Sequence, residues 1–393
     1  MQTSQENAIA ANEKELGLRF YLSREPLILA LLSALTVVSF LAVGGLSRIY
    51  HSQRESLGNR WFMRGAADLK QQHFELAVNE FRTALLYSRN SYAYQFDLAE
   101  ALIGLKRTNE AYAYLINLWG REPENGLVNL ELARIAVQRG ETDQALRYYH
   151  NAIYAIWPGD QEAEGRNARL ELIEYLLAIK AMTPAQAELI ALAANLDDDP
   201  AMHARVGDLF LQAHDYEHAL AEYRLSLKVD QHNSAALAGA GTAAFQLGRY
   251  DLAQRYLEAA VTANPDDLQS ADRLKTTELV LKMDPFRRQI SVDQRHRIVI
   301  EAFAAAGERL NSCTALGNST GTASSATSKL RLAEEWAQMK PQITEQGLRR
   351  NPDLVETAMS LVFDIERQAN AACGSSTEID MALLLISKLH EGN

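Results

Sequence analysis

The clearest hydropathy pattern near the N-terminus is an uncharged apolar run from Pro26 to Leu46, broken only by Ser33, Thr36 and Ser39. As a helix, a run of this length rises about 31 Å, which matches the hydrocarbon core of a bilayer. The pattern therefore predicts one transmembrane helix over residues 26–46, after a short N-terminal tail over residues 1–25. The lipid bilayer is thus one expected partner.

Two other interpretations of this run are a buried helix of a soluble domain and a cleaved signal peptide. The run is longer than the apolar segment of a usual signal peptide, and the residues around Gly44 to Arg48 contain no clean A-x-A cleavage site. An uncleaved, single-pass anchor fits the pattern better.

The charges that flank the run do not decide its orientation. Basic residues occur on both sides, at Lys14, Arg19 and Arg24 before the run and at Arg48, Arg54, Arg60 and Arg64 after it. Long domains translocate largely regardless of such charges, and a short tail before one span is typical of a bacterial signal anchor. We therefore expect the large C-terminal domain in the periplasm or exterior rather than in the cytoplasm.

A second pattern pairs a small residue with an Ala that follows a polar turn, often with an aromatic residue between them. It occurs at Gly65, Phe74 and Ala77; Ala99 and Ala111; Ala133 and Ala145; Gly207, Tyr216 and Ala219; and Gly241, Tyr250 and Ala253. The steps from Ala77 to Ala111, from Ala111 to Ala145 and from Ala219 to Ala253 are equal. A fixed period of this size, about 34 residues, is typical of a stacked helical repeat. The longer gap between Ala145 and Ala219 holds one such period plus an irregular unit.

These positions resemble the tetratricopeptide repeat (TPR) family over residues 59–266. Further matching positions are Trp61, Phe81, Ala84, Leu115, Tyr149, Ala152, Tyr223, Leu257, Ala260, Pro123 and Pro265. The resemblance implies an all-α fold, an α-solenoid of helix-turn-helix repeats over residues 59–283. Residues 160–199 form the irregular unit, in which we expect Thr183 to cap a helix and Pro184 to take its first position.

The C-terminal part keeps helical periodicity but shows no repeat. It predicts a C-terminal helical domain over 284–393, with helices near 291–310, 328–349, 352–372 and 377–390 and a flexible loop over 311–328. Cys313 and Cys373 fall at predicted helix ends, so we expect a disulfide between them in an oxidising compartment. Two separate buried thiols are the alternative.

Composition excludes several function classes. The net charge is −11 and no Lys/Arg-rich cluster occurs, which disfavours nucleic acid as a partner. Two cysteines cannot build a four-ligand zinc site or a disulfide framework. We expect no cofactor and no metal.

Three short patterns look catalytic but fit structural explanations better. His214 to His218 matches H-x-x-E-H, yet the repeat register places it in a turn between helices. Gly317 to Gly321 matches G-x-S-x-G, but no strand precedes it. Gly239 to Ala244 matches the dinucleotide fingerprint, but it lies where a repeat requires small residues for packing.

In the TPR family, the first helix of each pair lines the concave face that binds ligands. By register, the resemblance implies a partner-binding groove lined by Phe62, Ala66, Lys70, Phe96, Glu100, Leu130, Arg134, Gln138, Asp208, Gln212, Thr242, Phe245 and Gln246. The family's carboxylate-clamp members use Lys, Asn and Arg at such positions. Because most of these residues are apolar, acidic or amide here, we expect a folded protein or an amphipathic segment instead.

The predicted function is a membrane-anchored scaffold or assembly factor that mediates protein–protein interactions, in a membrane or envelope complex. The alternative is an enzyme with its site in the C-terminal helical domain. That domain offers only His296 and His390, far apart in sequence. We therefore expect that the chain is not an enzyme.

Overall fold

The computed structural model describes residues 3–313, 323–374 and 377–390. These residues form helices, and their only bridge of β type is an isolated one between Asn125 and Ile156. The prediction of an all-α fold is confirmed. The chain divides into two compact units, Met1–Ala168 and Arg169–Asn393.

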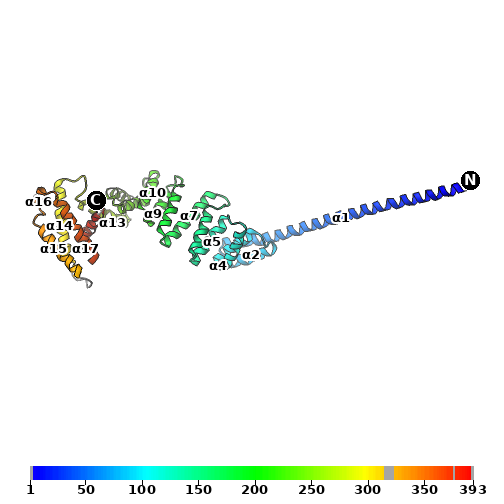
Figure 1. Cartoon of the computed structure of the whole chain (residues 1–393), viewed down its shortest axis with the longest axis horizontal. Helices are drawn as coiled ribbons and strands as arrows, with labels where there is room; N and C mark the ends of the chain where they lie inside the picture. The colour runs from blue at the N-terminus through cyan, green and yellow to red at the C-terminus, as the bar shows by residue number, and fades with distance from the viewer. Residues whose placement is uncertain (1–2, 314–322, 375–376, 391–393) are drawn as a thin grey trace. The chain divides into compact units, whose positions relative to one another are not determined.

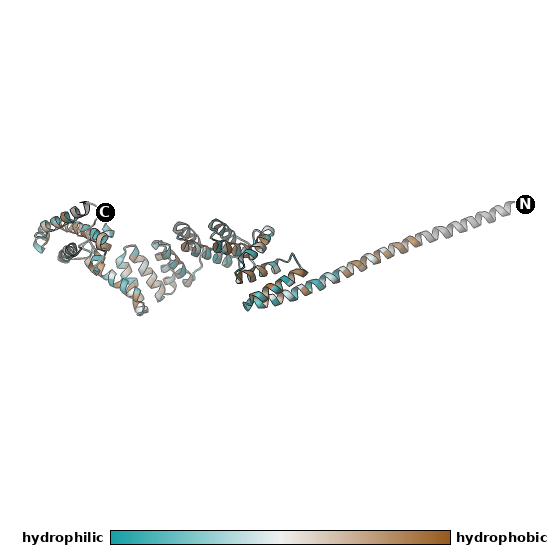
Figure 2. Cartoon of the chain, turned by 90° about the horizontal axis from the view of Figure 1, so that it is seen from below, coloured by the Kyte–Doolittle hydropathy of each residue, from teal (hydrophilic) through white to brown (hydrophobic). Residues whose placement is uncertain are grey.

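The first helix, α1 (Thr3–Lys70), joins the predicted tail, the predicted span and the first repeat helix without a break (Figure 1). Figure 2 shows its apolar stretch in brown, and every side chain over residues 27–46 is exposed. Phe40, for example, is 79% exposed. Among the described residues, α1 is the one helix that is long and apolar enough to cross a membrane.

The rest of unit 1 consists of short antiparallel helices. The C-terminal part of α1 pairs with α2 (Phe74–Tyr87), α3 (Tyr92–Gly104) pairs with α4 (Thr108–Arg121), and α5 (Gly126–Arg139) pairs with α6 (Thr142–Ile153). The alanines Ala77, Ala111 and Ala145 are fully buried, as the repeat register predicts. Unit 1 is therefore a stack of helix pairs, and the first helix of the first pair is the C-terminal part of α1.

Unit 2 continues the repeat pattern. Its helices in this part are α7 (Gln161–Ala178), which begins in unit 1, α8 (Met182–Ala193), α9 (Pro200–Gln212), α10 (Tyr216–Val229), α11 (Ser234–Gln246), α12 (Tyr250–Ala263) and α13 (Leu268–Met283). Ala219 and Ala253 are fully buried. The α-solenoid expected over 59–283 is thus present as helix pairs within each unit.

All six turns inside the helix pairs share one conformation. One residue has a positive φ, and the second helix begins two residues later; these residues are Gln72, Lys106, Gly140, Lys180, His214 and Gly248. Successive turns keep the repeat period, except that the step from Gly140 to Lys180 is slightly longer. The irregular unit is therefore an ordinary repeat with a short insertion between these two turns.

This turn explains why the predicted cap of α8 is wrong. Helix α8 begins at Met182, its N-cap is Ala181, and no side chain caps it. Lys180 has φ 59°, so the shared turn starts the helix before Thr183 and leaves Pro184 as its third residue. The geometry of the turn, rather than the capping sequence Thr183-Pro184, determines where α8 begins.

The C-terminal domain is a bundle of five described helices instead of the predicted four. They are α14 (Val292–Ser312), α15 (Ala323–Met339), α16 (Glu345–Arg350), α17 (Leu354–Cys373) and α18 (Glu378–His390). Pro341 ends the predicted helix 328–349 early, because the residue before a proline disfavours helical backbone. Thr344 then caps α16 by accepting a hydrogen bond from the backbone N–H of Gly347 at 3.1 Å.

The predicted loop over 311–328 is wrong at both ends. Residues 311–312 belong to α14 and residues 323–328 belong to α15, since Ala and Ser permit helix there. The remainder, residues 314–322, lies outside the described residues. The composition of residues 311–328 therefore predicts a longer loop than the one between α14 and α15.

Cys313 and Cys373 form a disulfide that joins the C-terminal ends of α14 and α17, with their Cα atoms 6.0 Å apart. Arg309, one turn before Cys313, donates hydrogen bonds to the carbonyl oxygens of Ala369 and Gly374. The bridge and these bonds fix the same two helix ends.

Glu366 is fully buried in this bundle, and neither carboxylate oxygen has a hydrogen-bond partner. Burial, together with the nearby charge of Asp380 and against the opposing charge of Arg309, raises its pKa to about 8. Glu366 is therefore mostly protonated at neutral pH.

Close helix packing at Gly239 gives the first prediction. A Cβ there would lie 2.2 Å from Cζ of the fully buried Tyr223. We expect Gly239→Ala to lower the free energy of unfolding by roughly 1–3 kcal/mol, because overpacking outweighs the gain in helix propensity. Denaturant unfolding followed by circular dichroism measures this.

Gly120 is the matched control, since it is helical and a Cβ there meets nothing within 4 Å. Gly120→Ala should raise the free energy of unfolding by about 0.5–1 kcal/mol. Equal effects of the two substitutions would contradict the close approach at Gly239.

Glu366 gives the second prediction. Between its ordinary pKa of 4.5 and its folded value of about 8, the folded state keeps a proton that the unfolded state releases. The free energy of unfolding should therefore fall as pH rises through this window. Glu366→Gln should remove that slope and stabilise the bundle by about 2–4 kcal/mol at pH 8, with little effect near pH 4.5.

Unfolding curves at several pH values test this, with Glu356→Gln as the control on the exposed side of the same helix. An unchanged pH slope in Glu366→Gln would show that Glu366 is not neutral in the folded bundle.

Candidate functional site

The inner face of unit 1 gathers acidic side chains from α3 and α5. Asp97 and Glu100 lie one turn apart on α3, and Glu131 and Arg134 lie one turn apart on α5. Arg134 Nη1 lies 2.5 Å from Glu131 Oε1. The structure thus brings the predicted residues Glu100 and Arg134 together and adds two acidic neighbours.

Burial shifts the titration of both α3 carboxyls. It raises the pKa of Asp97 to about 6. It raises the pKa of Glu100 to about 7, with further contributions from the charges of Asp97 and Glu131 and an opposing one from Arg134. These half-buried carboxylates favour a cationic neighbour, because a positive charge would offset their lost hydration.

Sequence reasoning missed Asp97 and Glu131, although a signal was present. Each residue lies one repeat period from its counterpart in the next repeat: Asp97 corresponds to Glu131, and Glu100 to Arg134. Comparing polar residues at equivalent repeat positions would have revealed the acidic pair.

The apolar groove residues predicted in unit 1 mainly pack the solenoid. Phe96 and Leu130 are buried, and the ring of Phe62 stacks on Tyr94 with centroids 4.8 Å apart. Ala66 is half-buried, whereas Lys70 and Gln138 are exposed. The polar positions of the predicted groove are therefore the ones available to a partner.

The predicted groove residues of unit 2 are engaged within the unit or exposed. Asp208 accepts a hydrogen bond from the Tyr223 hydroxyl at 2.5 Å, and Thr242 Oγ1 accepts one from Arg273 at 2.8 Å. Phe245 packs edge-to-face on Tyr250 with centroids 5.3 Å apart. Gln212 and Gln246 are exposed. This face lacks the concentrated charge found on α3 and α5.

The short catalytic-looking patterns adopt the structures that the repeat register predicts where they are described. His214 has φ 59° in a turn, and His218 lies in the first turn of α10 with Nδ1 2.8 Å from Asp215 Oδ2. Gly239 to Ala244 lies inside α11, and Gly317 to Gly321 lies outside the described residues. Within the described ranges, no group of three or more His, Cys, Asp or Glu side chains could hold a metal.

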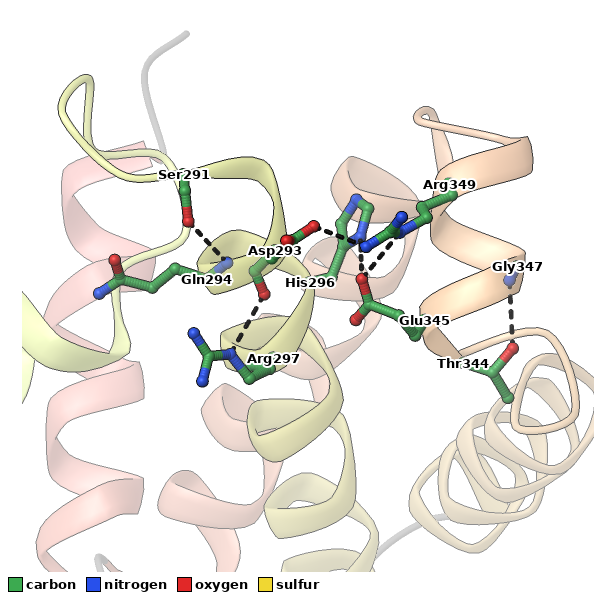
Figure 3. Close-up of polar contacts among 9 residues, drawn as sticks. All are labelled: Ser291, Asp293, Gln294, His296, Arg297, Thr344, Glu345, Gly347 and Arg349. Atoms are coloured by element: carbon green, nitrogen blue, oxygen red, sulfur yellow. Dashed lines mark hydrogen bonds and ion pairs between the residues drawn. The ribbon is translucent and has the colours of Figure 1, made fainter.

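The two histidines of the C-terminal domain line different hollows. Figure 3 shows His296 of α14 and Arg349 of α16 both directed at Glu345, with His296 Nδ1 3.2 Å and Arg349 Nε 3.1 Å from Glu345 Oε1. His296 borders a hollow of about 430 Å³. His390 borders one of about 830 Å³ and lies 3.6 Å from Asp284 Oδ1. Each histidine is thus paired with a carboxylate of its own.

Comparison with known proteins places the repeats in a family. The tetratricopeptide repeat model matches residues 102–155 and 210–277. No curated protein matches the chain. The two matched segments include the helices whose buried alanines and turns keep the repeat register.

Several solved structures are similar to this chain at low identity. YrrB, described as a TPR protein with an unusual peptide-binding site, is 14% identical, with 50% of this chain and 97% of that chain covered and a TM-score of 0.39. PilF of Pseudomonas aeruginosa is 16% identical, with 56% and 97% covered and a TM-score of 0.39. The C-terminal part of a TPR protein of Cytophaga hutchinsonii is 14% identical, with 61% and 94% covered and a TM-score of 0.45.

Identities and TM-scores this low do not transfer the functions of those proteins. The family model, the turn spacing and the buried small residues agree on the repeat type. Residues 102–155 and 210–277 of this chain therefore consist of tetratricopeptide repeats.

Proposed function

We propose that this chain is a membrane-anchored scaffold that holds a protein partner on the inner face of its first repeats. The observation that carries the proposal is the juxtaposition of Asp97 and Glu100 on α3 with Glu131 and Arg134 on α5. A TPR stack presents this face as an extended binding surface.

The charges indicate the chemistry of the partner. Asp97 and Glu100 are half-buried, which raises the pKa of both carboxyls, and the charge of Arg134 offsets this only in part at Glu100. A Lys or Arg side chain would supply the missing charge, whereas a partner's carboxylate would be repelled. The favoured partner is therefore a segment that carries basic residues.

Helix α1 supports the membrane anchor. Its apolar side chains over 27–46 have no cover in unit 1, and exposing such a surface to water is unfavourable. A bilayer would cover the whole stretch. Because the anchor continues directly into the first repeat, it would hold the binding face close to the membrane.

The disulfide bears on the orientation. A bond between Cys313 and Cys373 persists in oxidising compartments, which supports a large domain in the periplasm or exterior. The alternative function, an enzyme in the C-terminal helical domain, has less support. Its cysteines are joined, and His296 and His390 are each paired with a different carboxylate, Glu345 and Asp284.

The third prediction concerns partner capture. A photo-crosslinking residue at Glu100 of the full-length protein should crosslink a stoichiometric partner that co-purifies in mild detergent. The same residue at Asn117, exposed on α4, should not. Mass spectrometry of both products identifies the partner, and equal crosslinking from the two positions would contradict an inner-face site.

The fourth prediction concerns charge and pH. Asp97→Asn combined with Glu100→Gln should weaken partner binding about tenfold or more, while Asp143→Asn on α6 should leave it unchanged. Binding by the natural chain should also weaken as pH falls from 7.5 to 5.5, because Glu100 and then Asp97 become neutral. Titration of the purified partner measures both effects, and a pH-independent affinity would argue against the acidic site.

A further inference from the structure

One edge of unit 1 faces back along α1 towards the apolar stretch. Helix α2 runs antiparallel to α1 and ends at Tyr87, whose Cβ lies 3.2 Å from where a Cβ on Gly58 would sit. Arg54 Nη2 donates a hydrogen bond to the Leu86 carbonyl oxygen at 3.0 Å. The turn after α2 therefore lies beside residues 54–58 of α1, on the side of the apolar stretch.

The following turns are bonded into the same edge. Arg121, at the end of α4, donates to the Asn90 carbonyl oxygen at 3.2 Å. The backbone N–H of Ile156 donates to Glu124 O at 2.9 Å, and that of Gly126 donates to Ile156 O at 3.1 Å. We call the segments 86–91, 121–125 and 154–157 together the anchor-side edge.

Distance along α1 places this edge near a bilayer surface. Arg54, which bonds the Leu86 carbonyl, follows Leu46 by eight residues, a rise of about 12 Å, and Gly58 follows it by twelve, a rise of about 18 Å. The headgroup layer occupies about 5–8 Å beyond the hydrocarbon core. The usual tilt of a transmembrane helix, about 20°, lowers one side of the edge further. Long side chains on the turns can then reach the headgroups.

Exposed side chains on the edge suit such a surface. Leu86, Tyr154 and Ile156 are 67%, 76% and 62% exposed. Arg89 is exposed, and its guanidinium makes no hydrogen bond or ion pair among the described residues. The turns at the opposite ends of these helices carry mainly polar residues, such as Gln72, Lys106 and Glu141.

Charge varies along the edge. Arg89 lies in the turn next to α1, whereas Arg121 shares the following turn with the acidic residues Glu122 and Glu124. Attraction to anionic headgroups is therefore strongest beside the anchor. The turn of the anchor-side edge next to α1 is therefore the one that suits anionic lipid.

We infer that the anchor-side edge rests on the bilayer surface through its turn next to α1, with Arg89 at anionic headgroups and Leu86 next to the headgroup layer. This contact rests on the proposed membrane anchor. It would fix the orientation of the helix pairs of unit 1 relative to the membrane. The orientation of the face that carries Asp97, Glu100 and Glu131 would be fixed with them.

The test uses the full chain in phosphatidylcholine vesicles with and without phosphatidylglycerol, doped with a lipid that carries a nitroxide on its headgroup. Leu86→Trp places a fluorophore on the edge. Leu76→Trp is the control, because Leu76 is also exposed, at 55%, but lies at the other end of α2. Quenching of each added tryptophan is taken relative to the natural chain, and an alkaline wash tests whether the chain stays in the vesicles.

We expect the chain to resist the wash and the tryptophan at 86 to be quenched about twofold or more over that at 76. The difference should grow with phosphatidylglycerol and shrink in Arg89→Gln. Equal quenching in a chain that resists the wash would overturn the edge contact and leave the anchor standing. Release by the wash would overturn the anchor itself.

Discussion

The close approach of two helices at a small residue is the interaction on which both repeat segments depend. A Cβ added to Gly65, Gly207 or Gly241 would come within 2.7 to 2.9 Å of Phe81, Tyr223 or Leu257. Each large residue follows its glycine at the same offset along the chain. The shared turn holds this offset constant, so these three pairs bury the same kind of contact and present a similar surface to the next pair.

This constraint also links the fold to the proposed function. Because α1 supplies both the apolar stretch and the first repeat helix, any anchoring of α1 is passed rigidly to the helices stacked on it. The inner face and the anchor-side edge then take their directions from one helix. A membrane anchor on α1 would therefore connect to the binding face without a linker. The acidic side chains of α3 and α5 would then lie at a defined distance from the bilayer.

Much of the fold followed from the sequence, because the buried alanines recur with the period of the repeat. The sequence did not reveal that Lys180 adopts the positive φ of the shared turn, since no residue type such as Gly or Asn marks that conformation there. Pro341 separates α15 from α16, a division that helical periodicity alone does not show. For the binding face, register located Glu100 and Arg134 but could not tell that Phe96 and Leu130 are buried, because burial depends on the neighbouring pair.

The central claim is that helix pairs stack in register through one recurring turn. Hydrogen–deuterium exchange of the full chain in a lipid nanodisc tests it most directly. The account predicts protected amides in the helices from residue 59 to residue 283 and weaker protection in the turns between successive helices, which within the pairs fall at Gln72, Lys106, Gly140, Lys180, His214 and Gly248. Protection that runs unbroken through these turns, or breaks at unrelated spacing, would contradict it.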